Sequence, residues 1–119
     1  MSCITEQNNL GDLLKYEVSN LYSRDQITVA KGQNLKLGTV VALDKDNMIK
    51  IINPTATDGT QTAIGVIISD VNANKGVIIA RGAMLADHAV VWPANIIEEQ
   101  KTAAIKQLEG RGIIIRKGV

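Results

Sequence analysis

The sequence predicts an α+β domain that is mostly β: a small barrel-like sheet domain of short strands, one helix at about residues 96–109, a final strand and an N-terminal arm. Isoleucine, valine, leucine and alanine supply most of the apolar residues, and β-branched side chains fit pleated strands. Short aliphatic segments alternate with turn sequences from residue 26 onwards. After Pro93, apolar residues recur at spacings of three and four, which indicates one face of a helix.

Several segments have the composition and length of strands, separated by glycine, asparagine and aspartate. They are residues 26–30, 39–44, 48–52, 63–69, 77–85, 88–92 and 112–116. The sequence "DKDN" at 44–47 predicts a hairpin turn between two of them. The segment "AIGVIIS" at 63–69 is almost continuously apolar, which predicts a strand buried on both faces. Gly65 inside it predicts a bulge or a close approach of two backbones.

The expected helix follows the only tryptophan of the chain. Pro93 prevents the preceding strand from continuing and favours an extended backbone at Trp92, so Trp92 and Pro93 are predicted to form a structural corner. Asn95 and Glu98 have the spacing of a capping box, although a start one or two residues later fits equally well. Gly110 is placed to end the helix.

Residues 1–24 are predicted to form an arm, separate from a domain at 25–119, because they keep neither a period of two nor one of 3.6. The arm holds more large apolar side chains than a solvated tail needs: Leu10, Leu13, Leu14, Tyr16 and Tyr22. Two interpretations remain open. The arm folds back on its own domain, or it docks on a partner and gains order there.

The charge balance gives no reason to expect nucleic acid or anionic lipid as a partner. The chain of 119 residues has 13 basic and 12 acidic side chains, a formal net charge of +1. A single cysteine, Cys3, excludes an internal disulfide and fits a reducing cytoplasm. No apolar run approaches the roughly 18 residues of a membrane span, and residues 1–9 lack the pattern of a signal peptide.

The residues do not predict an enzyme, a cofactor or a metal site. His88 is the only histidine, and no serine or cysteine can be assigned beside it from the sequence. The glycines match neither the phosphate-binding loop nor the dinucleotide fingerprint. The alternative from the residues is a small β-barrel carrier or ligand-binding module, with Lys31, Lys36 or Lys45 as a weak imitation of a modified lysine.

Four stretches, taken in order, resemble the bacteriophage head decoration proteins of the lambda protein D family. They are "SRDQITVAKGQNLKLGTVVALD", "NPTATDGTQTAIGVIISDV", "GVIIARGAMLADHAVVWP" and "EEQKTAAIKQLEGRGIIIR". The most specific parts are "TDGTQTAIGV" at 57–66 and the pair Trp92 and Pro93 with the helix and strand behind it. "LGDLLKYE" at 10–17 is similar to a prophage branch of that family.

The resemblance implies a structural virion protein without enzymatic activity. Family members form homotrimers that sit on the outer surface of the expanded head at three-fold positions, clamp the major capsid protein and hold the shell against packaged DNA. The protein would be made in the cytoplasm of the bacterial host. In the family the arm becomes ordered against the capsid protein, so Leu10, Leu13, Leu14, Tyr16 and Tyr22 are the expected capsid contacts.

Overall fold

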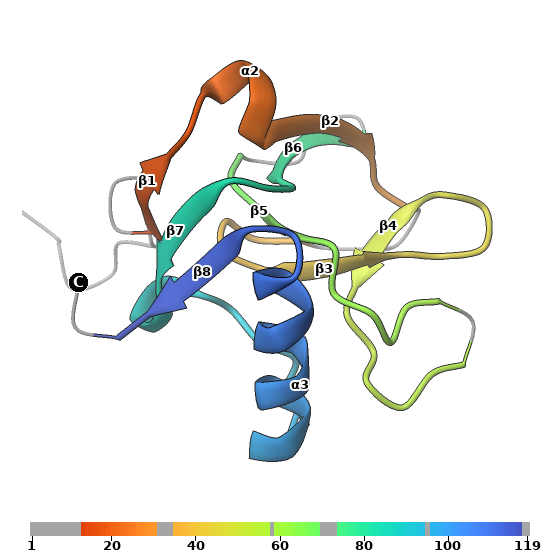
Figure 1. The fold of residues 1–119 in the computed structure, drawn as a ribbon. Helices are drawn as coiled ribbons and strands as arrows, with labels where there is room; N and C mark the ends of the chain where they lie inside the picture. Colours follow the sequence, from red (N-terminus) through yellow and green to blue (C-terminus); the bar gives the residue numbers. More distant parts are fainter. Residues whose placement is uncertain (1–12, 31–34, 58, 70–73, 95, 118–119) are drawn as a thin grey trace, which may run out of the picture.

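Two β-sheets and one long helix organise the residues that the computed structural model describes, which are 13–30, 35–57, 59–69, 74–94 and 96–117 (Figure 1). The strands are β1 Leu14–Glu17, β2 Arg24–Thr28, β3 Val40–Leu43, β4 Ile49–Ile51, β5 Gly65–Ile67, β6 Lys75–Ile79, β7 Ala83–Ala86 and β8 Ile113–Arg116. The helices are α2 Asn20–Ser23, the 3-10 helix η2 Asp87–Ala89 and α3 Glu98–Glu109.

The strands are divided between a three-stranded and a five-stranded sheet. Their orders are β1-β7-β8 and β2-β6-β5-β3-β4. Neighbouring strands are antiparallel except β7 and β8, which are parallel. The mostly β, α+β class is therefore confirmed. The barrel-like arrangement is not, because the described strands form two open sheets and neither closes on itself.

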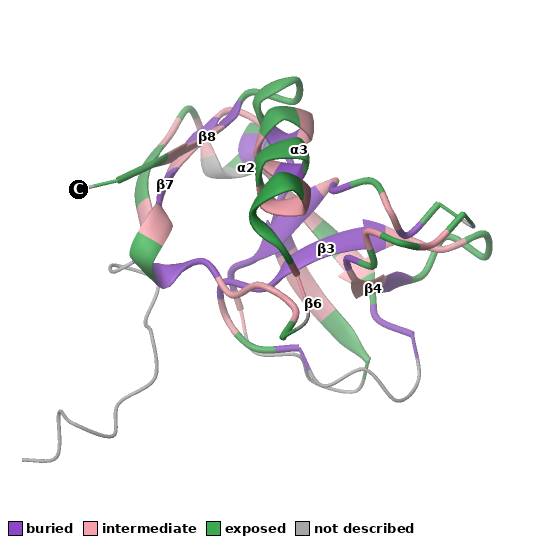
Figure 2. Cartoon of the chain, turned by 90° about the horizontal axis from the view of Figure 1, so that it is seen from below, coloured by how far each residue is buried: buried purple, intermediate pink, exposed green. Residues whose placement is uncertain are grey.

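The five-stranded sheet is buried on both faces at its centre. In β5, Val66 belongs to one cluster of buried side chains and Ile67 to another, on opposite faces of the strand. The first cluster lies between the two sheets and α3, since it also includes Leu85 and Leu108. Figure 2 shows β3 largely buried while the outer face of α3 is exposed. The strand predicted to be buried on both faces is confirmed.

Gly65 marks a close approach of two backbones, as predicted. A Cβ atom built at this position would lie 2.4 Å from the carbonyl oxygen of Ile79 in β6 and 2.9 Å from the side chain of Ile78. β5 and β6 pair directly beside this point, Val66 with Ile79. Only glycine therefore fits between the central strands without moving a backbone.

Two of the predicted strands are wrong in extent or type. Residues 77–85 do not form one strand but parts of β6 and β7, which lie in different sheets and are separated at Arg81 and Gly82. Gly82 has a φ of 60°, a left-handed conformation that ends β-pairing.

The strand expected at 88–92 is replaced by η2 and a single bridge of Val91 to Thr39. The amide of Val91 donates to Gly38 at 2.8 Å, and its carbonyl accepts from Val40 at 3.2 Å. The chain therefore turns towards β3 and does not extend along a neighbouring strand.

The helix is confirmed at 98–109, within the predicted range. Its start is the later one: Ile97 is the N-cap, and its amide donates to the side-chain oxygen of Gln100 at 3.1 Å. Asn95 lies outside the described residues. Gly110 is the C-cap, as predicted. Among the helices that the structure describes, none is long and apolar enough to cross a bilayer.

The turn at 44–47 joins β3 to β4, which confirms the predicted hairpin. One carboxylate oxygen of Asp44 accepts from the amides of Asp46 at 2.8 Å and Met48 at 3.0 Å. The bond from Met48 is the main reason that the pKa of Asp44 is lowered, and Lys50, 3.4 Å away, adds to the effect. The ionised side chain therefore holds the turn together.

We expect Gly65→Ala to destabilise the fold by about 3 kcal/mol, the upper end for overpacking, because the new methyl group meets the backbone of β6. Urea denaturation gives the free energy of unfolding. Gly110→Ala is the matched control, since there a Cβ atom meets nothing closer than 3.4 Å and φ is −61°. Equal stability of the two variants would contradict the close approach.

We expect Asp44→Ala to be less stable than the parent protein near neutral pH and to lose that difference in acid. Folding lowers the pKa of Asp44, so its ionised form stabilises the native hairpin above the ordinary carboxyl pKa of about 3.9. The contribution disappears as the pH falls through the lowered native pKa. Urea denaturation of both proteins at neutral pH and at pH values below the ordinary carboxyl pKa measures the difference in their free energies of unfolding. Asp46→Ala, which removes a carboxylate from the same turn, is the matched control.

Candidate functional site

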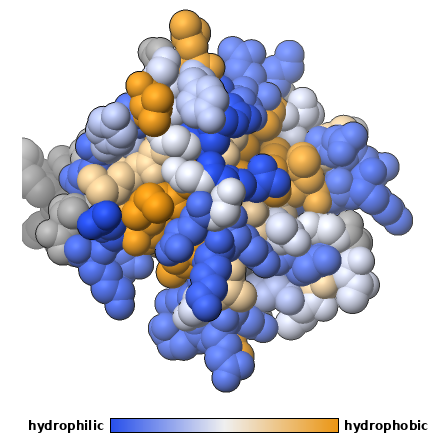
Figure 3. Space-filling model, in the orientation of Figure 1, coloured by the Kyte–Doolittle hydropathy of each residue, from blue (hydrophilic) through white to orange (hydrophobic). Residues whose placement is uncertain are grey.

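Exposed apolar side chains gather where β1 is joined to β2 through α2. Six large hydrophobic residues are exposed among those that the structure describes, and four of them fall within residues 16–22. These four are Tyr16, Val18, Leu21 and Tyr22. We refer to residues 16–23 as the α2 corner. In Figure 3 the most apolar colouring at the top of the molecule lies over this element, in the orientation of Figure 1.

Local hydrogen bonds shape the α2 corner. Ser19 is the N-cap of α2 and accepts from the amide of Leu21 at 3.3 Å, while its carbonyl accepts from the amide of Ser23 at 2.7 Å. These bonds close a single helical turn between two strands. Leu21, in the middle of that turn, is 92% exposed.

Gly82 fixes the α2 corner to the rest of the fold. Its carbonyl oxygen accepts from the amide of Val18 at 2.8 Å and from the buried hydroxyl of Ser23 at 3.0 Å. A Cβ atom at Gly82 would lie 3.1 to 3.3 Å from Tyr22, Val18 and Ser23. The corner therefore packs directly on the bend between β6 and β7.

Two arginine pairs flank the α2 corner. Arg24 donates to both carboxylate oxygens of Glu17, at 2.6 and 3.0 Å, and Arg81 donates to both of Asp25, at 2.7 and 3.1 Å. Hydrogen bonding to Glu17 is the main cause of the raised pKa of Arg24, and bonding to Asp25 raises that of Arg81. Each bidentate pair cancels one positive and one negative charge.

Arg81 also binds the α2 corner near its C-terminal end, at Tyr22. Its guanidinium donates to the carbonyl oxygen of Tyr22 and lies 5.6 Å from the centre of the Tyr22 ring. The charged guanidinium of Arg81 thus orients Tyr22, while 56% of Tyr22 stays exposed to solvent. The corner combines a fixed backbone with a solvent-facing apolar surface.

The five predicted contact residues do not lie together. Tyr16 and Tyr22 are exposed in the α2 corner. Leu14 is half-buried and pairs with Leu85 across β1 and β7, whereas Leu13 is fully buried in the first cluster. Leu10 lies outside the described residues. From residue 13 onwards the segment thus folds back on its own domain, the first of the two interpretations.

The sequence interpretation missed Val18 and Leu21. Both stand in the arm predicted at 1–24, and the lack of a regular period there was the only available signal. That signal does not separate them from Leu13, which stands in the same stretch and is buried in the first cluster. The corner of Trp92 and Pro93 stays a prediction. Trp92 is half-buried and packs against the first cluster, between the bridge at Val91 and the start of α3.

The outer strands of both sheets meet the α2 corner. β1 pairs with β7 on one side only, and β2 pairs with β6 on one side only, within the part of the chain that the structure describes. Such edges offer backbone donors and acceptors to a further strand. The segment 14–28 therefore presents two sheet edges and an apolar turn in succession.

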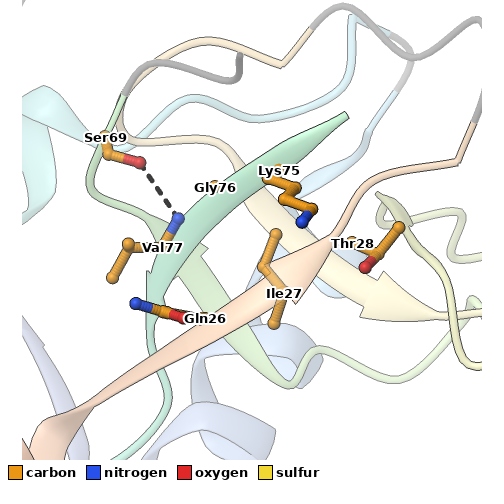
Figure 4. Close-up of a pocket in the computed structure, with 7 residues that line it drawn as sticks. All are labelled: Gln26, Ile27, Thr28, Ser69, Lys75, Gly76 and Val77. Atoms are coloured by element: carbon orange, nitrogen blue, oxygen red, sulfur yellow. Dashed lines mark hydrogen bonds between the residues drawn. The ribbon is translucent and has the colours of Figure 1, made fainter. Parts of the chain in front are cut away.

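A shallow hollow of about 550 Å³ lies beside the paired ends of β2 and β6 (Figure 4). Its lining residues are Gln26, Ile27, Thr28, Ser69, Lys75, Gly76 and Val77. The amide of Val77 donates to the hydroxyl of Ser69 at 3.0 Å. Among the described residues that line the hollow, none carries a carboxylate, an imidazole or a thiol.

The residues considered for chemistry are scattered. His88 is exposed in η2. Lys45 is exposed in the β3–β4 turn and Lys36 is exposed before β3, while Lys31 lies outside the described residues. No described feature gathers them into one site.

A family model for the bacteriophage lambda head decoration protein D matches residues 3–113. The chain belongs to the lambda head decoration protein D family. It is a structural protein of the phage virion with a capsid decoration role, and it associates with the phage capsid. The family that the sequence resembles is thereby confirmed. A comparison with curated proteins gives no match.

We expect Ser23→Ala to destabilise this decoration protein by about 1 kcal/mol, because it removes the hydroxyl that donates to Gly82. Thermal or urea denaturation measures the change. Thr102→Ala, at an exposed position of α3, removes a hydroxyl of similar size and serves as control. A loss no larger than that of the control would show that the hydroxyl of Ser23 does not anchor the corner.

Proposed function

We propose that this protein forms homotrimers that bind the outside of the expanded phage head at three-fold positions and stabilise the shell against the pressure of packaged DNA. The family match over residues 3–113 carries the proposal. The major capsid protein is the proposed partner. The surface that supports it is the α2 corner, whose exposed apolar side chains belong to neither of the two clusters of buried residues that the structure describes.

Within this proposal residues 1–24 supply the capsid contact, and residues 13–24 do so while packed on the decoration domain of residues 25–119. The burial of Leu13 separates the residue that anchors the segment from the residues that contact the capsid. Leu13 anchors the segment to the first cluster, and Tyr16 and Tyr22 face outwards as contacts. Leu14 and Leu10 are assigned to the same contact, Leu14 through the exposed part of its half-buried side chain.

Among the described strands β1 pairs with β7 alone, which supports a backbone-mediated contact on its other side. An extended capsid segment that paired with Leu14–Glu17 would add a further strand to the three-stranded sheet β1-β7-β8. Backbone hydrogen bonds give such a contact affinity with little demand on side chains. A trimer presents three copies, so individually weak contacts add up on a lattice that repeats the same site.

We expect deletion of residues 2–12 to weaken binding to expanded heads at least tenfold while leaving the domain folded. The cut stops before Leu13, because Leu13 belongs to the core. Co-sedimentation of full-length and shortened protein with purified expanded heads measures the affinity, and thermal unfolding reports on the fold.

Light scattering of the free proteins and electron microscopy of decorated heads complete the test. We expect the mass of a trimer and density at three-fold positions. A full-length protein that neither trimerises nor decorates expanded heads would overturn the proposed function. Undiminished binding of the shortened chain would overturn only the assignment of residues 2–12.

A further inference from the structure

We propose that Leu21, exposed on the α2 corner together with Val18, forms a rigid uncharged knob that inserts into an apolar recess of the capsid protein. The inference rests on the proposed function, and it adds a side-chain contact that is separate from strand addition at β1. Neither residue belongs to the contact set expected from the sequence.

Exposure and rigidity distinguish this knob from a scattered surface leucine. Leu21 is 92% exposed and Val18 60%, and both stand on a backbone fixed through Gly82 and Ser19. A single exposed apolar side chain needs no explanation, but four of them on one anchored turn mark a contact surface. Because the turn is already ordered, docking loses little conformational entropy.

Charge limits the kind of partner. The two arginines that border the α2 corner are each held by a carboxylate, Arg24 by Glu17 and Arg81 by Asp25. The corner therefore offers no unpaired guanidinium for an acidic peptide, a nucleic acid or a phosphate headgroup. What it offers is aliphatic and aromatic surface, which fits a recess lined by apolar side chains.

A second copy of the chain is a poorer occupant than the capsid protein. A cyclic trimer needs two different surfaces that meet at an angle which closes the ring. Among the described residues, a groove beside the exposed Ile97 is lined by Ile51, Ile52, Pro54, Pro93, Ala94 and Ile96 together with Asn53, Thr55 and Gln100. The start of α3, which contributes Gln100 to this lining, lies at the end of the molecule opposite α2 (Figure 1). A knob-to-groove contact between opposite ends propagates a chain of subunits and does not close a trimer.

The test measures binding of Leu21→Asp and Leu21→Ala to expanded heads with the full chain. We expect affinity to fall about tenfold for the alanine variant and further for the aspartate variant, which carries a charge into the recess. Met48→Asp is the matched control, since Met48 is exposed in a different part of the surface. Leu21 is 92% exposed, so thermal unfolding of these variants should match that of the parent protein.

Ionic strength provides a second readout. The contribution of Leu21, taken as the ratio of parent to Leu21→Ala affinity, should stay constant between about 0.1 and 0.5 M salt, because screening acts on charges. A ratio that falls towards one with added salt would overturn the apolar contact.

The possible outcomes separate this inference from the proposed function. If the parent protein decorates heads and both Leu21 variants bind as well as Met48→Asp, the knob is wrong and the proposed function stands. If the parent protein does not bind expanded heads, the proposed function itself fails. If the Leu21 variants bind heads normally but lose the mass of a trimer, the knob contacts a second copy, and the capsid assignment is overturned.

Discussion

The carbonyl oxygen of Gly82 is the point at which the two sheets are joined. The chain leaves the five-stranded sheet at the end of β6, bends at Arg81 and Gly82, and enters the three-stranded sheet as β7. The N-terminal segment connects the sheets in the opposite direction, because β1 belongs to the three-stranded sheet and the chain continues through α2 to β2 of the five-stranded sheet. Val18 and Ser23 both donate to Gly82, so one crossing is bonded to the other. The relative position of the sheets depends on this contact.

The same contact explains why the exposed surface is where it is. β1 pairs with β7, and β2 pairs with β6. A single helical turn, α2, connects β1 to β2. The inward side of that turn is occupied by Ser23, which is fully buried against Gly82. The outward side is left to Val18 and Leu21. The surface that we propose for the capsid contact thus lies on the element that connects the two sheets, next to the segment that resembles the family arm.

Much of the fold follows from patterns that a sequence carries locally. The continuous apolar run around Val66 predicted a strand buried on both faces, Gly65 predicted a close approach, and the spacing after Pro93 predicted α3. The split at Gly82 and the 3-10 turn at Asp87 were missed, because both depend on which sheet the next strand joins. Of the exposed residues of the α2 corner, Tyr16 and Tyr22 were named from the sequence, whereas Val18 and Leu21 were not, for the same reason. The apolar residues of the corner are exposed only because Leu13 and β1 are already docked elsewhere.

Anchoring and neutrality of the α2 corner have a common physical origin. Arg81 orders Tyr22 and is itself neutralised by Asp25, while Arg24 is neutralised by Glu17 across the start of β2 and the end of β1. The groups that stiffen the turn are therefore the groups that remove its net charge. Covering a stiff, uncharged surface costs little conformational entropy, and it does not require water to be removed from an unpaired charge. Under the proposed function, in which many copies bind one shell, such a surface allows each contact to be small and the sum to be large.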